Sequence, residues 1–142
     1  MSVKEVQDEI IEEFNLLAGD RESTIFYIME LGDKMSPLPE EVKIEDNIIK
    51  GCQSKVWLVT EASQNKIILK ADSNTAITKG LVSLLIRIFS ERKPEEILDA
   101  ELYFLDKIGM SSVIGSQRSN GLAAMIKQIK MYALAYQAKF RS

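Results

Sequence analysis

The segment "KVWLVTEASQNKIILKAD", residues 55–72, predicts the centre of the fold. Apolar side chains fall on both faces of an extended chain over residues 55–61, which is typical of a strand covered on both sides. "ASQN" supplies a turn, and Ile67, Leu69 and Ala71 then share one face of a second strand. The segment therefore predicts an antiparallel hairpin, and "EDNIIKG", residues 45–51, predicts a third strand just before it.

Helical patterns surround the predicted sheet. Apolar residues at helical spacing predict helices over residues 3–17, 21–32, 73–92, 94–101 and 122–140, with a short helix or turn over 102–109. Asp20 is placed to cap the second helix, and Ser73 or Asn74 the third. "DKMSPLPEE" and "GSQRSNG", residues 33–41 and 115–121, predict loops. The pattern indicates one α+β domain over residues 1–142, with a small antiparallel three-stranded sheet packed against helices.

Charge is distributed unevenly along the chain. The formal net charge is −3, yet residues 1–50 hold thirteen acids and five bases, and residues 118–142 hold five bases and no acid. An acidic chain argues against a general nucleic-acid binder. The two charged ends fit solvated helix faces, or a surface that docks on a charged protein partner. No stretch is long and apolar enough to predict a membrane span, and a single cysteine favours a cytoplasmic location.

The chain contains no histidine, which restricts its chemistry. Ser-His-Asp and Cys-His nucleophile arrangements are impossible without an imidazole. One cysteine and no histidine also do not make a zinc or iron–sulfur site. The sequence predicts no metal and no cofactor of its own.

Cys52 is the only cysteine, and it follows Gly51 in a polar stretch, "KGCQSK". A lone cysteine is commonly a small buried hydrophobe. A reactive thiol fits as well, because Gly51 lets the backbone bend and because the cations Lys50 and Lys55 favour a thiolate. A reactive thiol without a general base is suited to sulfur–sulfur exchange rather than hydrolysis. The second sulfur must then come from another molecule.

Four blocks resemble, in order and spacing, the SufE family of sulfur acceptors: "YIMELGDKMSPLPEE" (27–41), "NIIKGCQSKVWLV" (47–59), "ADSNTAITKGLVSLLI" (71–86) and "GSQRSNGLAAMIKQIK" (115–130). The resemblance covers roughly Phe14 to Leu134. It implies the α+β fold that this family shares with IscU/NifU-type scaffolds. It also implies that the protein takes persulfide sulfur from a PLP-dependent, SufS-like cysteine desulfurase, enhances its activity, and passes the sulfur to an iron–sulfur scaffold.

Carried onto this chain, the resemblance makes Cys52 the sulfur acceptor. Gly51, Gln53 and Ser54 lie beside it, and the last two are placed to bind a persulfide anion. Asp72 and Lys79 fall in the block that flanks the docking surface for the desulfurase, although Asp72 also fits the end of the hairpin.

Arg118 matches the arginine of the family block "SRSxGL", where it contacts the loop or the desulfurase, or orders the loop before the last helix. Gln117 replaces the first serine of that block, so any role of its hydroxyl does not transfer. Ser119 or Asn120 is predicted to cap the last helix, and Trp57 is predicted to be a core residue.

Three alternatives stay open at this point. A CsdE-like acceptor of the same family serves a different desulfurase. An adaptor would activate the desulfurase by docking alone, with Cys52 as a bystander. A scaffold that assembles the cluster itself is disfavoured, because it needs more ligands than one cysteine provides.

Overall fold

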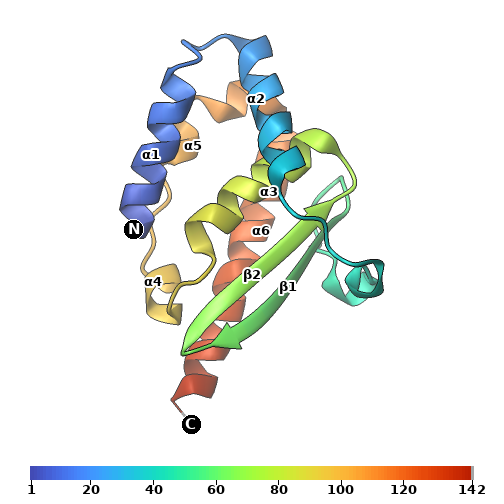
Figure 1. The fold of residues 1–142 in the computed structure, drawn as a ribbon, viewed down its shortest axis with the longest axis vertical. Coiled ribbons are helices and arrows are strands. Elements are labelled where there is room, and N and C mark those ends of the chain that lie inside the picture. Colours follow the sequence, from blue (N-terminus) through green and yellow to red (C-terminus); the bar gives the residue numbers. More distant parts are fainter. Residues whose placement is uncertain (142) are drawn as a thin grey trace.

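A two-stranded antiparallel hairpin made of β1 (Val56–Ser63) and β2 (Lys66–Ser73) lies along one side of the protein (Figure 1). The computed structural model describes residues 1–141. Gln64 and Asn65, which join the strands, both have positive φ (54° and 65°), as a two-residue turn of a twisted hairpin requires. The predicted hairpin and its turn are confirmed.

The prediction of a third strand is wrong. Residues 45–47 form a 3₁₀ turn (η2, Glu45–Asn47), after an earlier one (η1, Glu40–Val42). Only Ile48 then pairs with β1, in an isolated bridge to Trp57, although the Ile49 N–H also donates to the Val56 carbonyl at 2.8 Å. The chain turns away at Gly51, whose φ is +94°, so pairing stops after one bridge.

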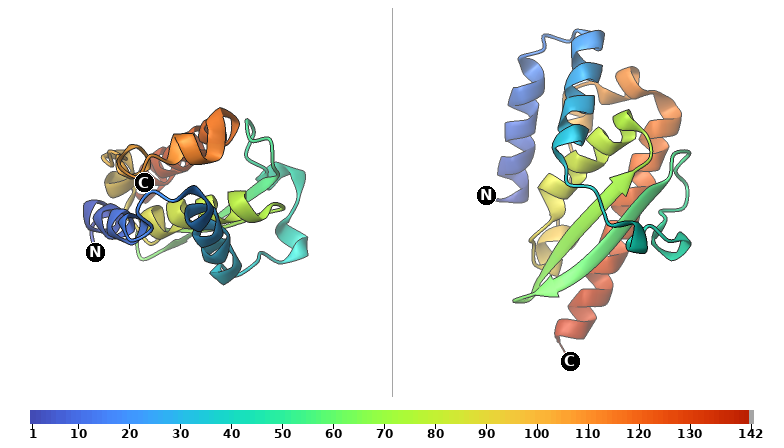
Figure 2. Two further views of the ribbon diagram at one scale, coloured as in Figure 1. Left: turned by 90° about the horizontal axis from the view of Figure 1, so that it is seen from above. Right: turned by 45° about the vertical axis from the view of Figure 1, so that its right-hand side comes forward.

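The helices pack on the hairpin in layers. α1 (Val3–Asn15) and α2 (Arg21–Lys34) form an N-terminal pair, and α3 (Ala76–Phe89) lies between that pair and α6 (Met110–Phe140) (Figure 2). The short helices α4 (Pro94–Leu98) and α5 (Phe104–Lys107) connect α3 to α6. One face of the hairpin is buried with α3 in a single hydrophobic cluster, which includes Val56, Leu58, Ile67, Leu69, Leu81, Leu85 and Ile88.

Glycines allow α2 and α3 to cross at very short distance. A Cβ atom built on Gly80 would lie 1.9 Å from the backbone oxygen of Ile28, and one on Gly32 would lie 2.8 Å from the backbone nitrogen of Gly80. No side chain fits between the two backbones at this crossing. The glycines therefore fix how α3, and with it the end of β2, is placed against the N-terminal helices.

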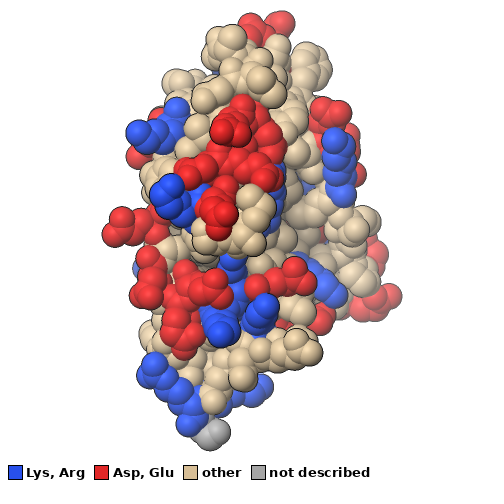
Figure 3. Space-filling view, turned by 60° about the vertical axis from the view of Figure 1, so that its left-hand side comes forward, with Lys and Arg blue, Asp and Glu red and all other residues tan. Residues whose placement is uncertain are grey.

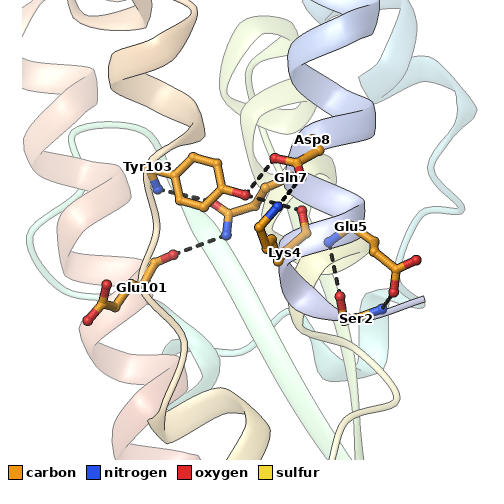
Figure 4. A network of polar contacts seen from close by, with 7 residues as sticks. All are labelled: Ser2, Lys4, Glu5, Gln7, Asp8, Glu101 and Tyr103. Carbon is orange, nitrogen blue, oxygen red and sulfur yellow. Dashed lines mark hydrogen bonds and ion pairs between the residues drawn. The ribbon is translucent and has the colours of Figure 1, made fainter.

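A polar network fastens the start of α1 to the segment before α5 (Figure 4). The Gln7 side chain is buried; its amide donates to the Glu101 carbonyl (3.1 Å) and its oxygen accepts from the Tyr103 N–H (2.9 Å). The Tyr103 hydroxyl donates to Asp8 at 2.6 Å. A capping box between Ser2 and Glu5 begins the helix. These bonds satisfy backbone groups that the core would otherwise leave unpaired.

Most of the predicted helices are confirmed, with small shifts at their ends. Asp20 caps α2 through the Ser23 N–H (2.9 Å), as expected. Thr75, rather than Ser73 or Asn74, occupies the N-cap of α3, and its side chain makes no capping bond.

The prediction of a loop over 115–121 is wrong. Within α6 only Gly115 leaves helical geometry (φ 83°, ψ 167°). Ser119 and Asn120 are helical, so neither caps the helix, and the Ser119 hydroxyl donates instead to the Gly115 carbonyl at 3.0 Å.

Candidate functional site

Cys52 lies on the loop that enters β1, at the end of the hairpin where β2 passes into α3. Its thiol is half-buried, and Sγ donates a hydrogen bond to the Gly121 carbonyl of α6 at 3.4 Å. A Cβ on Gly121 would stand 3.4 Å from that sulfur, and a Cβ on Gly51 would stand 3.2 Å from the Cβ of Ala124. The two glycines therefore allow the cysteine loop to lie directly on α6.

The thiol borders a cavity of about 420 Å³ between the loop, α3 and α6. One part of its wall is apolar, made by Val56, Leu81, Val82, Ile114, Leu122 and Met125. The other part is polar, made by Gln53, Ser54, Thr78, Ser116, Gln117 and Arg118 with the backbone of Gly115 and Gly121. The cavity is large enough for a small group on the sulfur, with apolar surface on one side and hydrogen-bond donors on the other.

Burial raises the pKa of the Cys52 thiol above its ordinary value. The hydrogen bond to the Gly121 carbonyl also favours the protonated form, because a carbonyl oxygen accepts a proton and repels an anion. The prediction that Lys50 and Lys55 favour a thiolate is wrong, because the pKa of the thiol is raised. Both side chains are exposed, and neither offsets the effect of burial on the pKa of the thiol.

Ser54 is held by two threonines at the start of α3. Its hydroxyl oxygen accepts hydrogen bonds from Thr75 (3.0 Å) and Thr78 (3.3 Å). A hydroxyl has one proton and two lone pairs, so the Ser54 proton remains for a further acceptor. Ser54 lines the cavity, so an anionic sulfur within it is a suitable acceptor. Gln53 lines the same cavity and is exposed.

Arg118 stands on the first turns of α6 after the break at Gly115, and it lines the cavity with Cys52. Its guanidinium donates to the Ile114 carbonyl at 3.3 Å. Within residues 1–141 no carboxylate forms an ion pair with it. Most of its five N–H donors are therefore free for an anion brought into the cavity.

Asp72 and Lys79 do not line the cavity. Asp72 is 1% exposed, and its carboxylate accepts from the Leu38 N–H (3.0 Å) and the Ser73 N–H (2.8 Å). It also pairs with Lys43 (3.2 Å) and Lys79 (3.4 Å). Asp72 thus joins the segment after α2 to the hairpin and α3, close to where the cysteine loop passes into β1. Its predicted place beside a docking surface stays a prediction.

Trp57 lies on the hairpin face opposite the main core and is partly buried, with the Lys43 ammonium 5.5 Å from its ring centroid. It does not line the cavity of Cys52. Sequence reasoning missed Thr78 and Met125, which do line it, because nothing in their local pattern separates a cavity wall from ordinary helix packing.

Alkylation of Cys52 is expected to be slow in the folded protein. Only the thiolate reacts with alkylating reagents. The raised pKa lowers the fraction of Cys52 that is thiolate, and burial limits the access of the reagent to the sulfur. We expect iodoacetamide to react more slowly than with a free thiol, and a bulky maleimide to be slowed further. The same protein in urea is the control for each reagent. Equal rates in the folded and unfolded protein would contradict a shielded thiol.

Asp72→Asn is expected to lower the free energy of unfolding by about 2 kcal/mol at neutral pH, because Lys43 and Lys79 lose their partner. Burial raises the pKa of Asp72, but hydrogen bonds from Leu38, Ser73 and Lys43, with the charge of Lys79, bring it below its ordinary value. A depressed pKa stabilises the fold above the unfolded pKa, and this contribution is lost as pH falls through the folded pKa.

Urea unfolding of both proteins between pH 3 and 7 tests this expectation. The difference should narrow below about pH 4, where carboxyl groups become protonated. A difference that does not depend on pH would contradict the assignment.

The fold and the cavity together define a class: a small α+β protein with one thiol on a loop against a helix. The chain belongs to the SufE family, whose family model, described as "Fe-S metabolism associated domain", matches residues 8–133.

Two curated relatives agree with this assignment, and a solved structure shares the fold. An uncharacterized SufE-like protein of Rhizobium meliloti (strain 1021) is 37% identical over 132 residues, which cover 89% of this chain and 93% of that one. One of Rhizobium etli is 40% identical over 129 residues, which cover 87% and 86%. The solution structure of a hypothetical protein from Thermus thermophilus has a TM-score of 0.75 at 19% identity, covering 94% of this chain and 96% of that one. At that identity the likeness concerns the fold alone.

Within residues 1–141, no helix is long and apolar enough to cross a membrane. No three or more thiol and carboxylate side chains of these residues gather where they would hold a metal ion.

Proposed function

We propose that this single-domain protein is a sulfur acceptor in iron–sulfur metabolism, with Cys52 as the residue that carries the sulfur. It takes persulfide sulfur from a PLP-dependent cysteine desulfurase in the cytoplasm, enhances the turnover of that enzyme, and delivers the sulfur to an iron–sulfur scaffold. The PLP belongs to the desulfurase. One observation carries the proposal: the only thiol of a SufE-family chain borders a cavity that has room and donors for one more sulfur.

The transfer is an exchange between sulfur atoms. Cys52 loses its proton to solvent, and its thiolate attacks the outer sulfur of the donor persulfide. A new sulfur–sulfur bond forms at Cys52, the old bond breaks, and the donor cysteine leaves as a thiolate, so no external oxidant or reductant is needed. The Ser54 hydroxyl and the Arg118 guanidinium are suited to stabilise the persulfide anion that results.

The loop has to move before this reaction. In the isolated protein the thiol is protonated, half-buried and bonded to the Gly121 carbonyl. We infer that docking of the desulfurase lifts the loop from α6, which breaks that bond and exposes the sulfur. After transfer, return of the loop would place the persulfide in the cavity, away from thiols in solution.

Two other activities within the same family remain as alternatives. The partner can be the desulfurase of a CsdE-like system, or the protein can activate a desulfurase by docking alone. A scaffold that holds a cluster by itself fits poorly, because the chain offers one thiol and no imidazole.

The amount of sulfur bound tests the proposal. The protein is incubated with cysteine and a SufS-like desulfurase, separated by gel filtration, and treated with cyanide, which converts sulfane sulfur to thiocyanate. We expect close to one thiocyanate per chain, and none when cysteine or the desulfurase is omitted. A protein that returns without sulfane sulfur, while still stimulating the enzyme, would favour the adaptor instead.

A further inference from the structure

An apolar groove lies between α4 and α6, apart from the cavity of Cys52. It has a volume of about 550 Å³, and its apolar wall includes Leu98, Ile126, Met131 and Leu134. Met131 is 55% exposed and Leu134 is 60% exposed, one turn apart on α6. Neighbouring exposed apolar side chains that border a groove mark a surface for a partner more often than isolated ones do.

The groove and the cysteine cavity use opposite sides of α6. Leu122 and Met125 line the cavity, and Met131 and Leu134 line the groove. Met131 follows Leu122 by nine positions, and Leu134 follows Met125 by nine. Nine positions are about two and a half turns at 3.6 residues per turn, so the groove residues lie on the far side of the helix from the cavity residues. A molecule bound in the groove would therefore leave the Cys52 loop uncovered.

The basic residues that line the groove indicate that its partner is acidic. Lys127 and Lys130 line it, and residues 110–141 contain five basic residues and no acid. Lys127 is exposed and has no ion pair within residues 1–141, while Lys130 uses one donor on the Ala100 carbonyl (2.8 Å) and keeps two. Figure 3 shows several Lys and Arg side chains at the lower end of the protein, with Asp and Glu side chains above them.

A second copy of the chain is a poor occupant. A two-fold contact brings the same surface of both copies together, so the lysines of the two grooves would face one another. No acidic residue among residues 1–141 lines the groove, and Glu95 of α4 lies 3.5 Å from Gln137, beyond Leu134. The apolar wall and the two lysines are instead complementary to a partner that presents acidic side chains on either side of an apolar stripe.

We propose that the groove between α4 and α6 binds an acidic amphipathic helix of a partner protein, at the same time as Cys52 on the opposite side of α6 exchanges sulfur. Met131 and Leu134 receive the apolar stripe of that helix, and Lys127 and Lys130 pair with its carboxylates. The assignment of the groove as a binding site rests on the exposure and charge of its residues, and it does not depend on the sulfur chemistry.

Two synthetic peptides test the groove in the full chain. Both are helical, about 15 residues long, with leucines at i, i+3, i+4 and i+7; one carries glutamates beside the leucines and the other lysines. We expect the glutamate peptide to shift amide NMR signals of Leu98 and residues 123–134 and to leave Cys52 unshifted. Met131→Glu with Leu134→Glu should abolish these shifts, and Phe26→Glu, a change at a 70% exposed residue of α2, should leave them unchanged.

Reversal of charge completes the test. Lys127→Glu with Lys130→Glu should weaken binding of the glutamate peptide at least tenfold and allow the lysine peptide to bind. The proposal is overturned if the glutamate peptide does not bind at millimolar concentration, if both peptides bind equally, or if the shifts lie elsewhere. Concentration-dependent self-association that the Met131 and Leu134 changes remove would overturn it as well, in favour of a second copy. A negative result leaves transfer of sulfur to Cys52 intact.

Discussion

A Cys52→Ser variant is expected to accept no radiolabelled sulfur from a cysteine desulfurase. A serine hydroxyl is not ionised near neutral pH and is no nucleophile toward sulfur under these conditions, and the chain has no other cysteine that could take the label. The fold should be retained, because the side chains differ by one atom and the hydroxyl can still donate to the Gly121 carbonyl. The measurement is label on the isolated chain together with the rate of alanine formation.

Two results separate relay from docking alone. If Cys52 carries the sulfur, the variant loses both the label and the enhancement of desulfurase turnover. If the variant binds no label yet enhances turnover fully, the protein is an adaptor and the relay is wrong. Cys52→Ser with Ser63→Cys is the matched control, since it moves the only thiol to an exposed position at the end of β1. We expect this control to accept little sulfur, because its thiol lacks the cavity.

Gly80→Ala is expected to lower the free energy of unfolding by about 3 kcal/mol or more. The new Cβ would stand 1.9 Å from the Ile28 backbone oxygen, and no change of side-chain rotamer moves a backbone atom. α2 and α3 must separate, and α3 carries Leu81, Leu84 and Leu85 of the core. Urea unfolding followed by circular dichroism measures the change.

Gly19→Ala is the control for the glycine crossing. Gly19 has a φ of +74°, and a Cβ atom added to it would meet no atom within 4 Å, so its substitution tests backbone strain without a clash. We expect a loss of about 1 kcal/mol there. If Gly80→Ala costs no more than Gly19→Ala, the close crossing of α2 and α3 does not restrict residue 80 to glycine.

Local patterns were enough to predict most of the fold. Alternation within residues 55–72 predicted the hairpin. Helical spacing predicted a core face of the last helix made of Leu122, Met125, Ile126, Ile129, Ala133 and Tyr136; Ile126 and Tyr136 are only partly buried, and the other four are buried. The third strand was wrong because the residue types of 45–51 do not reveal that the chain turns away at Gly51. The loop over residues 115–121, which lie within α6, was wrong because glycine, serine and asparagine are typical of loops, and packing against Cys52 overrides that tendency.

The sequence identified part of the candidate site, and the rest depends on contacts between residues that are distant in the sequence. The sequence singled out Cys52, and the family resemblance added Gln53, Ser54 and Arg118; the structure brings these four to one cavity. The other residues that the resemblance added, Gly51, Asp72 and Lys79, do not line it. The sequence could not predict the protonation of the thiol, because Lys50 and Lys55 are close in sequence while the burial comes from α6, whose Gly121 is 69 residues away. Asp72 is a comparable case: its partners Leu38 and Lys43 lie on a distant segment that only the fold brings near.

Mass spectrometry of the Cys52 peptide tests the account most directly. The protein is incubated with cysteine and a SufS-like desulfurase, blocked with an alkylating reagent, and digested. The account predicts a peptide that contains Cys52 heavier by one sulfur atom, and no such gain when the desulfurase is omitted. Desulfurase that turns over at an enhanced rate, with a Cys52 peptide of unchanged mass throughout, would contradict it.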